Sequence, residues 1–181
     1  VGSEMCIRDR RYIERHYGEG DGNGENIMNP TTVVELGEGS YMEMETTQIK
    51  GVDSTVRTTN AKLGPRATLI IREKVMTHGR QLAKSDFTVD LDGEDCHTNV
   101  ISRSVAKDQS RQVFLARING NARCYGHSEC DAIIMDQGVV AAIPEVPANC
   151  VDASLVHEAA IGKIAGEQLI KLMTLGLTEK E

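Results

Sequence analysis

Large aromatic side chains are scarce in this chain of 181 residues, which has no Trp, two Phe and four Tyr. A β-helix enzyme that acts on polysaccharide usually presents a groove of aromatic and acidic side chains, so the scarcity argues against that class of protein. Without aromatic anchors, a core must be built from many small contacts between Val, Ile, Leu, Ala and Met. Such a core suits a solenoid with a narrow interior.

Several further features are missing, and each excludes a class of function. The net charge is −7 and no cluster of Lys and Arg is present, which argues against a nucleic-acid partner. No run of about 18 apolar residues occurs, so the sequence contains no membrane span. No P-loop occurs, so we expect this chain to bind no nucleotide by itself. No serine elbow or distinctive carboxylate pair is visible, and we expect no independent enzymatic activity.

The five cysteines lack the spacing of a disulfide framework, and together with the acidic composition this favours a reducing, cytoplasmic location. Cys6 lies in residues 1–10, which resemble translated adapter sequence and are set aside from fold reasoning. We predict a non-native or disordered leader over residues 1–14. A Gly-rich surface loop is expected over residues 15–30, because no apolar strand precedes its glycines and no Gly-Lys-Ser/Thr follows them.

Short β-branched runs separated by turn glycines characterise residues 31–158, which we predict to be the core. An aliphatic residue stands just before each of four glycines, Gly37, Gly64, Gly93 and Gly120, which follow one another at intervals of 27, 29 and 27 residues. A fixed period of this size is expected of stacked coils that share sheets. The predicted strands are 33–36, 41–45, 67–71, 87–91, 99–104 and 113–118. The period favours a mainly β fold, a parallel β-helix, with an antiparallel sandwich of the same strands as the alternative.

The periodicity changes near the end of the chain. Leu169, Leu172 and Met173 have the i, i+3, i+4 spacing of a helix face, and Gly176 follows as a stop signal. Residues 178–181 read Thr-Glu-Lys-Glu, a capping box that signals the start of another helix. We predict that residues 159–181 begin a C-terminal helical domain that this sequence cuts short.

Two thiols and one imidazole are spaced by two residues at each step in Cys124, His127 and Cys130. In a turn, this spacing can aim soft ligands at one metal ion, which gives the hypothesis of a zinc-binding structural β-solenoid. The competing interpretation is structural, because reduced cysteines are commonly buried as small hydrophobes and a histidine can be satisfied within a turn. The spacing alone does not decide between the two.

The other cysteines and histidines have a structural interpretation. Cys96 and His97 lie beside an apparent turn, and His78 lies in the turn-like sequence Met-Thr-His-Gly. Cys150 follows Pro-Ala-Asn and matches no ligand pattern that we identify.

A long ordered series of segments resembles the SufB/SufD family of iron–sulfur cluster assembly proteins, especially its shorter, self-pairing members. The segments that carry the resemblance are Tyr41-Met-Glu-Met-Glu, Gln48-Ile-Lys-Gly-Val-Asp-Ser-Thr, Met76-Thr-His-Gly, Ile101-Ser-Arg-Ser-Val-Ala-Lys-Asp, Cys130-Asp-Ala-Ile-Ile-Met, Ala142-Ile-Pro-Glu-Val and His157-Glu-Ala-Ala-Ile-Gly-Lys. The resemblance runs from about Arg15 to the last residue. It implies a right-handed parallel β-helix with a helical tail.

Matched residue by residue, the resemblance implies that Cys130 holds a nascent iron–sulfur cluster and that His157 and Glu158 supply non-thiolate ligands at a subunit interface. Cys124 and His127 are secondary candidates. If residues 154–160 form a strand, His157 and Glu158 point to opposite faces, so we expect only one of them to face the cluster unless a bulge intervenes.

The resemblance also implies partners for a scaffold subunit. These are a second SufB/SufD-like subunit, either an identical copy or a paralogue, a sulfur donor protein, and a SufC-like ABC ATPase bound through the helical tail. The cluster is assembled on such a scaffold and then released.

Overall fold

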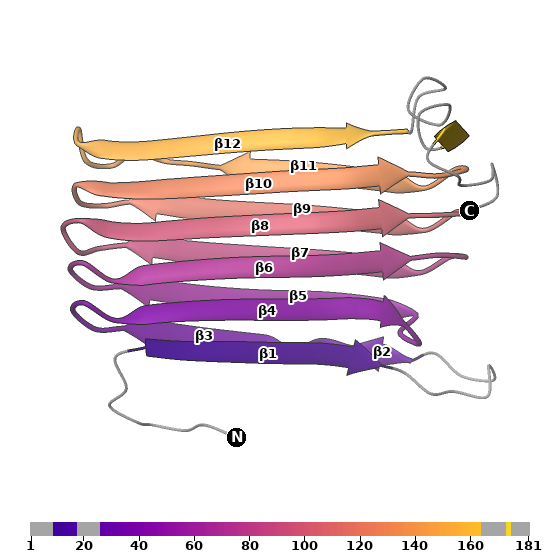
Figure 1. Cartoon of the computed structure of the whole chain (residues 1–181), viewed down its shortest axis with the longest axis horizontal. Coiled ribbons are helices and arrows are strands. Elements are labelled where there is room, and N and C mark those ends of the chain that lie inside the picture. Colours follow the sequence, from indigo (N-terminus) through magenta and orange to yellow (C-terminus); the bar gives the residue numbers. More distant parts are fainter. Residues whose placement is uncertain (1–8, 18–25, 164–172, 175–181) are drawn as a thin grey trace.

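The chain winds between two parallel sheets in the computed structural model, which describes residues 9–17, 26–163 and 173–174. Sheet A has the order β1-β4-β6-β8-β10-β12, and sheet B has the order β11-β9-β7-β5-β2, with β3 also paired to β5. The labelled strands of the two sheets lie in two layers and run in opposite directions, because each complete coil contributes one strand to each sheet (Figure 1). The described part is therefore a parallel β-solenoid of about five turns.

Every ladder between the described strands is parallel, so the antiparallel sandwich considered as the alternative is wrong. The strands of sheet A are β1 (Asp9–Tyr17), β4 (Tyr41–Lys50), β6 (Thr68–Thr77), β8 (Cys96–Ala106), β10 (Cys124–Ile134) and β12 (Ala153–Gly162). The strands of sheet B are β2 (Ile27–Met28), β3 (Thr31–Leu36), β5 (Ser54–Leu63), β7 (Leu82–Leu91), β9 (Arg111–Gly120) and β11 (Val139–Glu145).

The turns stack as regularly as the strands. The backbone amide of Gly64 donates to the carbonyl of Leu36 at 2.8 Å, and the amide of Gly93 donates to the carbonyl of Leu63 at 3.0 Å. These bonds join positions one coil apart, which confirms that the glycine period of the sequence is the coil length. A residue therefore lies beside the residue that occupied the same place in the preceding coil.

Side chains alternate between the interior of the solenoid and its surface, as the pleat of a strand requires. One half of the interior, near the start of the sheet A strands, is apolar and fully buried. Its members come from both sheets and include Leu63, Leu69, Ile71, Val89, Leu91, Val100 and Ile118. Each buried aliphatic side chain stabilises the fold by about 1.5–3 kcal/mol before conformational entropy is subtracted.

The other half of the interior is polar. The carboxylate of Glu73 on β6 accepts hydrogen bonds from the hydroxyls of Ser102 on β8, at 2.9 Å, and Ser85 on β7. Arg57 on β5 lies 4.0 Å from the same carboxylate and donates to Glu14 at 3.0 Å. Buried ionisable groups are costly unless they are hydrogen-bonded or paired, and this network provides both kinds of partner.

All six predicted strands overlap strands of the structure, but others escaped prediction. β5 is one of these, because its inward positions include Thr55, Arg57 and Thr59, whose side chains hide the hydrophobic alternation. β10 is another, since the residues from Cys124 to Cys130 were considered as a turn and are a continuous strand. Strands whose inward side chains are polar lack the apolar alternation by which a strand is predicted from sequence.

Strands extend beyond both predicted boundaries of the core. Residues 9–14, which the sequence assigned to a leader, lie in β1, which pairs in parallel with β4. At the other end, β12 continues to Gly162, past the predicted boundary at residue 158, because its ladder with β10 extends that far.

Most of the predicted C-terminal helix falls on residues 164–172 and 175–181, which lie outside the described residues. Met173 and Thr174, the two described residues of that segment, have helical backbone. Among the described residues, no helix is long and apolar enough to cross a membrane.

We expect Gly93→Ala to destabilise the solenoid by about 1–3 kcal/mol, the usual cost of overpacking. A Cβ atom at this position would lie 2.1 Å from the carbonyl carbon of Gly64 and from the nitrogen of Pro65, so the stacked turns would have to separate. Gly37→Ala is the matched control, because the nearest atom to a Cβ there is 4.0 Å away. Urea unfolding checks the pair, and equal unfolding free energies for the two variants would contradict the stacking argument.

We expect Glu73→Gln to become more stable relative to the wild type as the pH rises. Burial raises the pKa of Glu73 above its usual value, against the opposing effect of its serine partners. The stability contributed by a group with a raised folded pKa is complete below the unfolded pKa and is lost as the pH rises through the folded pKa. Gln cannot ionise, yet it can still bond both serines.

The measurement is urea unfolding of both proteins at a series of pH values from about 4 to about 8, which spans the normal carboxyl titration and extends to neutral pH. Glu35→Gln, on an exposed position of β3, serves as the control. A stability difference between wild type and Glu73→Gln that stays constant with pH would contradict the prediction.

Candidate functional site

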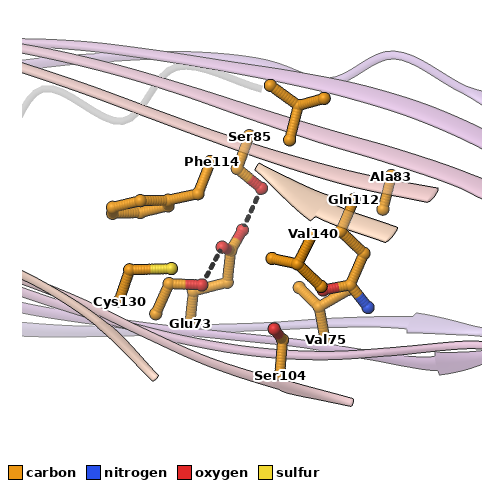
Figure 2. Close-up of a pocket in the computed structure, with 11 residues that line it drawn as sticks. Glu73, Val75, Ala83, Ser85, Ser104, Gln112, Phe114, Cys130 and Val140 are labelled. Atoms are coloured by element: carbon orange, nitrogen blue, oxygen red, sulfur yellow. Dashed lines mark hydrogen bonds between the residues drawn. The ribbon is translucent and has the colours of Figure 1, made fainter. Parts of the chain in front are cut away.

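Cys130 lies on β10 and points into the polar half of the solenoid, where only 1% of the residue is exposed. In-register pairing aligns it with Ser102 on β8 and, one strand further, with Glu73 on β6. Figure 2 shows the Cys130 thiol and the Glu73 carboxylate lining the same cavity, with the hydrogen bonds of Glu73 drawn as dashed lines. The thiol is therefore part of a polar row that crosses three coils.

The environment of Cys130 favours the neutral thiol. Burial, together with the nearby carboxylates of Glu73 and Asp131, raises the pKa of Cys130 to about 11. A thiol must lose its proton before it can bind a metal ion. Burial therefore favours the protonated, unreactive form of this thiol.

The cavity beside Cys130 is small. It has a volume of about 10 Å³, close to the size of one water molecule, and its lining includes Glu73, Ser102, Gln112 and Phe114. A cluster of several atoms cannot be enclosed there without movement of the surrounding strands. Toward the end of the solenoid, β12 is the last described strand of sheet A.

His157 on β12 points to the same interior face as Cys130. It pairs with Ser128, two residues before Cys130 on the neighbouring strand, so the Cα atoms of Cys130 and His157 are about 8 Å apart by strand geometry. The Nδ1 atom of His157 is buried without a hydrogen-bond partner among the described residues. Burial, assisted by His127, lowers the pKa of His157, so the ring is neutral at neutral pH and has a lone pair available.

Glu158 points to the opposite, outer face, and its side chain is 68% exposed. It lies 3.8 Å from Nε2 of His127, whose Nδ1 is 3.1 Å from the amide oxygen of Asn99. Since an amide oxygen can only accept, Nδ1 of His127 carries a proton in this contact. The side chains of the adjacent residues His157 and Glu158 therefore lie on opposite faces of sheet A, as expected for a strand without a bulge.

Cys124 does point inward, but it is six residues from Cys130 along one strand, a separation of about 20 Å. Its neighbour across the ladder is the buried Cys96, far from the polar row. His127 projects from the other face. Cys124, His127 and Cys130 therefore cannot bind one ion together, and among the described residues no group of three His, Cys, Asp or Glu side chains is arranged to hold a metal.

Sequence reasoning missed Glu73 and Ser102, the polar neighbours of Cys130. Their signal was present in the coil period, because Ser102 precedes Cys130 by 28 residues and Glu73 precedes Ser102 by 29. Counting back one coil at a time from a candidate residue identifies the side chains stacked against it.

A family model described as SUF system FeS cluster assembly, SufBD core domain, matches residues 15–181. An iron–sulfur cluster assembly SufBD family protein of Methanocaldococcus jannaschii is 32% identical over 172 residues, which cover 94% of this chain and 54% of that protein. A second, of Archaeoglobus fulgidus, is 30% identical over 154 residues, which cover 84% of this chain and 42% of that protein. The chain spans about half the length of these relatives. The family model covers nearly the whole chain, which therefore belongs to the SufBD family of iron–sulfur cluster assembly proteins.

Proposed function

We propose that this chain is a scaffold subunit on which an iron–sulfur cluster is assembled, with Cys130 and His157 as its ligands from this subunit. The observation that supports the proposal is that a buried thiol faces the same interior as a neutral imidazole whose Nδ1 atom has no hydrogen-bond partner among the described residues. Thiolate and imidazole are both suitable iron ligands. The cluster is cargo, and the chain needs no enzymatic activity of its own.

Two donors do not complete the coordination of a cluster, so a second subunit supplies the rest. In the part of the chain that the structure describes, β12 and β11 are the last strands of their sheets, and no described strand pairs with their outer edges. Exposed strand edges favour pairing with another strand. A second SufB/SufD-like subunit, identical or paralogous, joins there and brings its own ligands to the interior face.

The coils of the proposed scaffold wind to the right, which is the hand that parallel crossovers adopt almost without exception.

The mixed ligand set fits a scaffold that must release its product. Binding iron requires the Cys130 thiol to lose its proton, and burial makes that loss unfavourable before iron binds. His157 binds as a neutral ring and gives up no proton. A cluster with one thiolate from this subunit is held less firmly than one with four cysteines, which favours transfer to a recipient.

The partners follow from the same assignment. A SufC-like ABC ATPase binds through the C-terminal segment and supplies the nucleotide hydrolysis that this chain lacks, and a sulfur donor protein delivers sulfide equivalents. The complex works in the cytoplasm. The alternative, a structural zinc site of Cys124, His127 and Cys130, is weakened because these residues do not converge.

We expect Cys130→Ala to abolish most of the charge-transfer absorption that appears when the chain, extended to its natural ends and combined with its ATPase partner, is reconstituted anaerobically with iron and sulfide. Cys124→Ala is the matched control, since it removes an inward thiol of the same strand about 20 Å away. Absorption that persists in Cys130→Ala and collapses in Cys124→Ala would overturn the assignment. Zinc retained after aerobic purification, without iron, would favour the structural zinc site.

We expect His157→Ala to lower the yield and stability of the reconstituted cluster more than Glu158→Ala does. His157 shares the interior face with Cys130, whereas Glu158 projects outward. The iron content per subunit and the rate of cluster loss to a chelator measure the difference. A greater loss in Glu158→Ala would mean that the outer face carries the cluster.

A further inference from the structure

Ser128 on β10 carries a buried hydroxyl group that has no hydrogen-bond partner among the described residues. The residue is completely buried, with 0% of its surface exposed. A buried hydroxyl without a partner loses its hydrogen bonds to water and gains none in return, so it destabilises the fold. Something other than the stability of the described solenoid therefore accounts for a serine at this position.

The row of inward side chains to which Ser128 belongs is otherwise apolar. Its ladder partner on β8 is Val100. Val100 pairs with Ile71 on β6, and Ile71 pairs with Met44 on β4. All three of these side chains are completely buried. A valine or an alanine at position 128 would continue this row, whereas a hydroxyl finds no partner in it.

Two groups of the candidate site flank the hydroxyl. His157 is the ladder partner of Ser128 on β12, about 4.8 Å away between Cα atoms, and its Nδ1 atom also lacks a partner among the described residues. Cys130 lies two residues further along β10 on the same interior face, about 7 Å away between Cα atoms. Side chains on one face of a strand project side by side, so this separation is too long for a direct hydrogen bond from the hydroxyl to the thiol.

The hydroxyl supplies what the other two groups lack. A neutral imidazole offers a lone pair at Nδ1, and a thiolate that binds iron is negatively charged, so neither donates a hydrogen bond to a bound anion from these atoms. A serine hydroxyl does donate, and a hydrogen bond to an ionised acceptor is stronger than one to a neutral acceptor. The sulfide ions of an iron–sulfur cluster are acceptors of this kind, and hydrogen bonds to them help to set its reduction potential.

We propose that the Ser128 hydroxyl donates a hydrogen bond to a sulfide of the cargo that Cys130 and His157 hold. The bond satisfies the hydroxyl only when the cargo is bound, so the serine destabilises the unloaded protein and stabilises the loaded one. This assignment rests on the proposed function, and it adds a residue that neither the spacing of the cysteines nor the family resemblance identified.

Ser128→Thr and Ser128→Val are the matched pair that tests the assignment, because the two side chains have the same shape and differ in the hydroxyl. The chain, extended to its natural ends and combined with its ATPase partner, is reconstituted anaerobically with iron and sulfide. We expect the cluster in Ser128→Val to be lost to a chelator several times faster than in Ser128→Thr, and its reduction potential to be more negative. Ser128→Ala, which adds no volume, should behave as Ser128→Val does. Equal rates and potentials in the matched pair would overturn the proposal.

Urea unfolding without iron or sulfide separates this role from a structural one. Ser128→Val should be at least as stable as Ser128→Thr, because the hydroxyl has no partner in the unloaded fold. A lower urea midpoint for Ser128→Val would mean that the hydroxyl is bonded within the fold, and would overturn the proposal.

Thr59→Val is the control for the loaded protein. Thr59, on β5 of sheet B, has a completely buried hydroxyl that also lacks a partner among the described residues. Its removal should leave the rate of cluster loss and the reduction potential unchanged. Changes as large as those in Ser128→Val would mean that any buried hydroxyl has this effect, and would contradict a specific bond from Ser128.

The outcomes also distinguish this assignment from the proposed function. A wild type that forms no cluster overturns both. A cluster that depends on Cys130 but is the same in Ser128→Thr and Ser128→Val overturns only the role of Ser128. A crystal structure of the loaded protein in which the hydroxyl bonds a water molecule, with no sulfide within hydrogen-bond distance, also overturns that role alone.

Discussion

In-register parallel pairing is the constraint on which this structure depends. It places each residue beside its counterpart one coil away, as in the ladders that join β6, β8 and β10. Side chains from distant parts of the sequence thereby become neighbours in rows that run along the solenoid. A row is stable only if its members suit one another, so apolar residues stack with apolar residues and the buried carboxylate of Glu73 stacks with a serine hydroxyl. The candidate site is the end of one such row.

The interior of the solenoid is divided into an apolar half and a polar half, and the candidate site lies in the polar half. The apolar half supplies the hydrophobic contribution, with leucine, isoleucine and valine side chains that exclude water. The polar half tolerates the ionisable groups because Ser85, Ser102 and Arg57 surround Glu73. Cys130 shares that environment, and burial keeps its proton in place. Cys96, a thiol in the apolar half, is also buried, and its ladder neighbour is Cys124.

The last described coil carries the features that the proposed function uses. The strand edges of β11 and β12 and the inward face that carries His157 are all located there. The proposed cluster site and the proposed subunit contact therefore lie at the same end of the described solenoid.

The sequence by itself determined the coil period and six of the strands, because the glycine spacing and the β-branched runs are local patterns. It favoured a parallel β-helix, but only the parallel ladders of the structure excluded an antiparallel sandwich of the same strands. It also gave Cys130 and His157 by resemblance to a family. Only the tertiary structure decided which candidates lie on the same face. Cys-x-x-His-x-x-Cys reads the same whether the backbone turns or extends, yet an extended strand separates Cys124 from Cys130 by about 20 Å and turns His127 to the other face. In the same way, the pleat and the ladder register assigned His157 to the interior and Glu158 to the surface, and brought Glu73 beside a cysteine far along the chain.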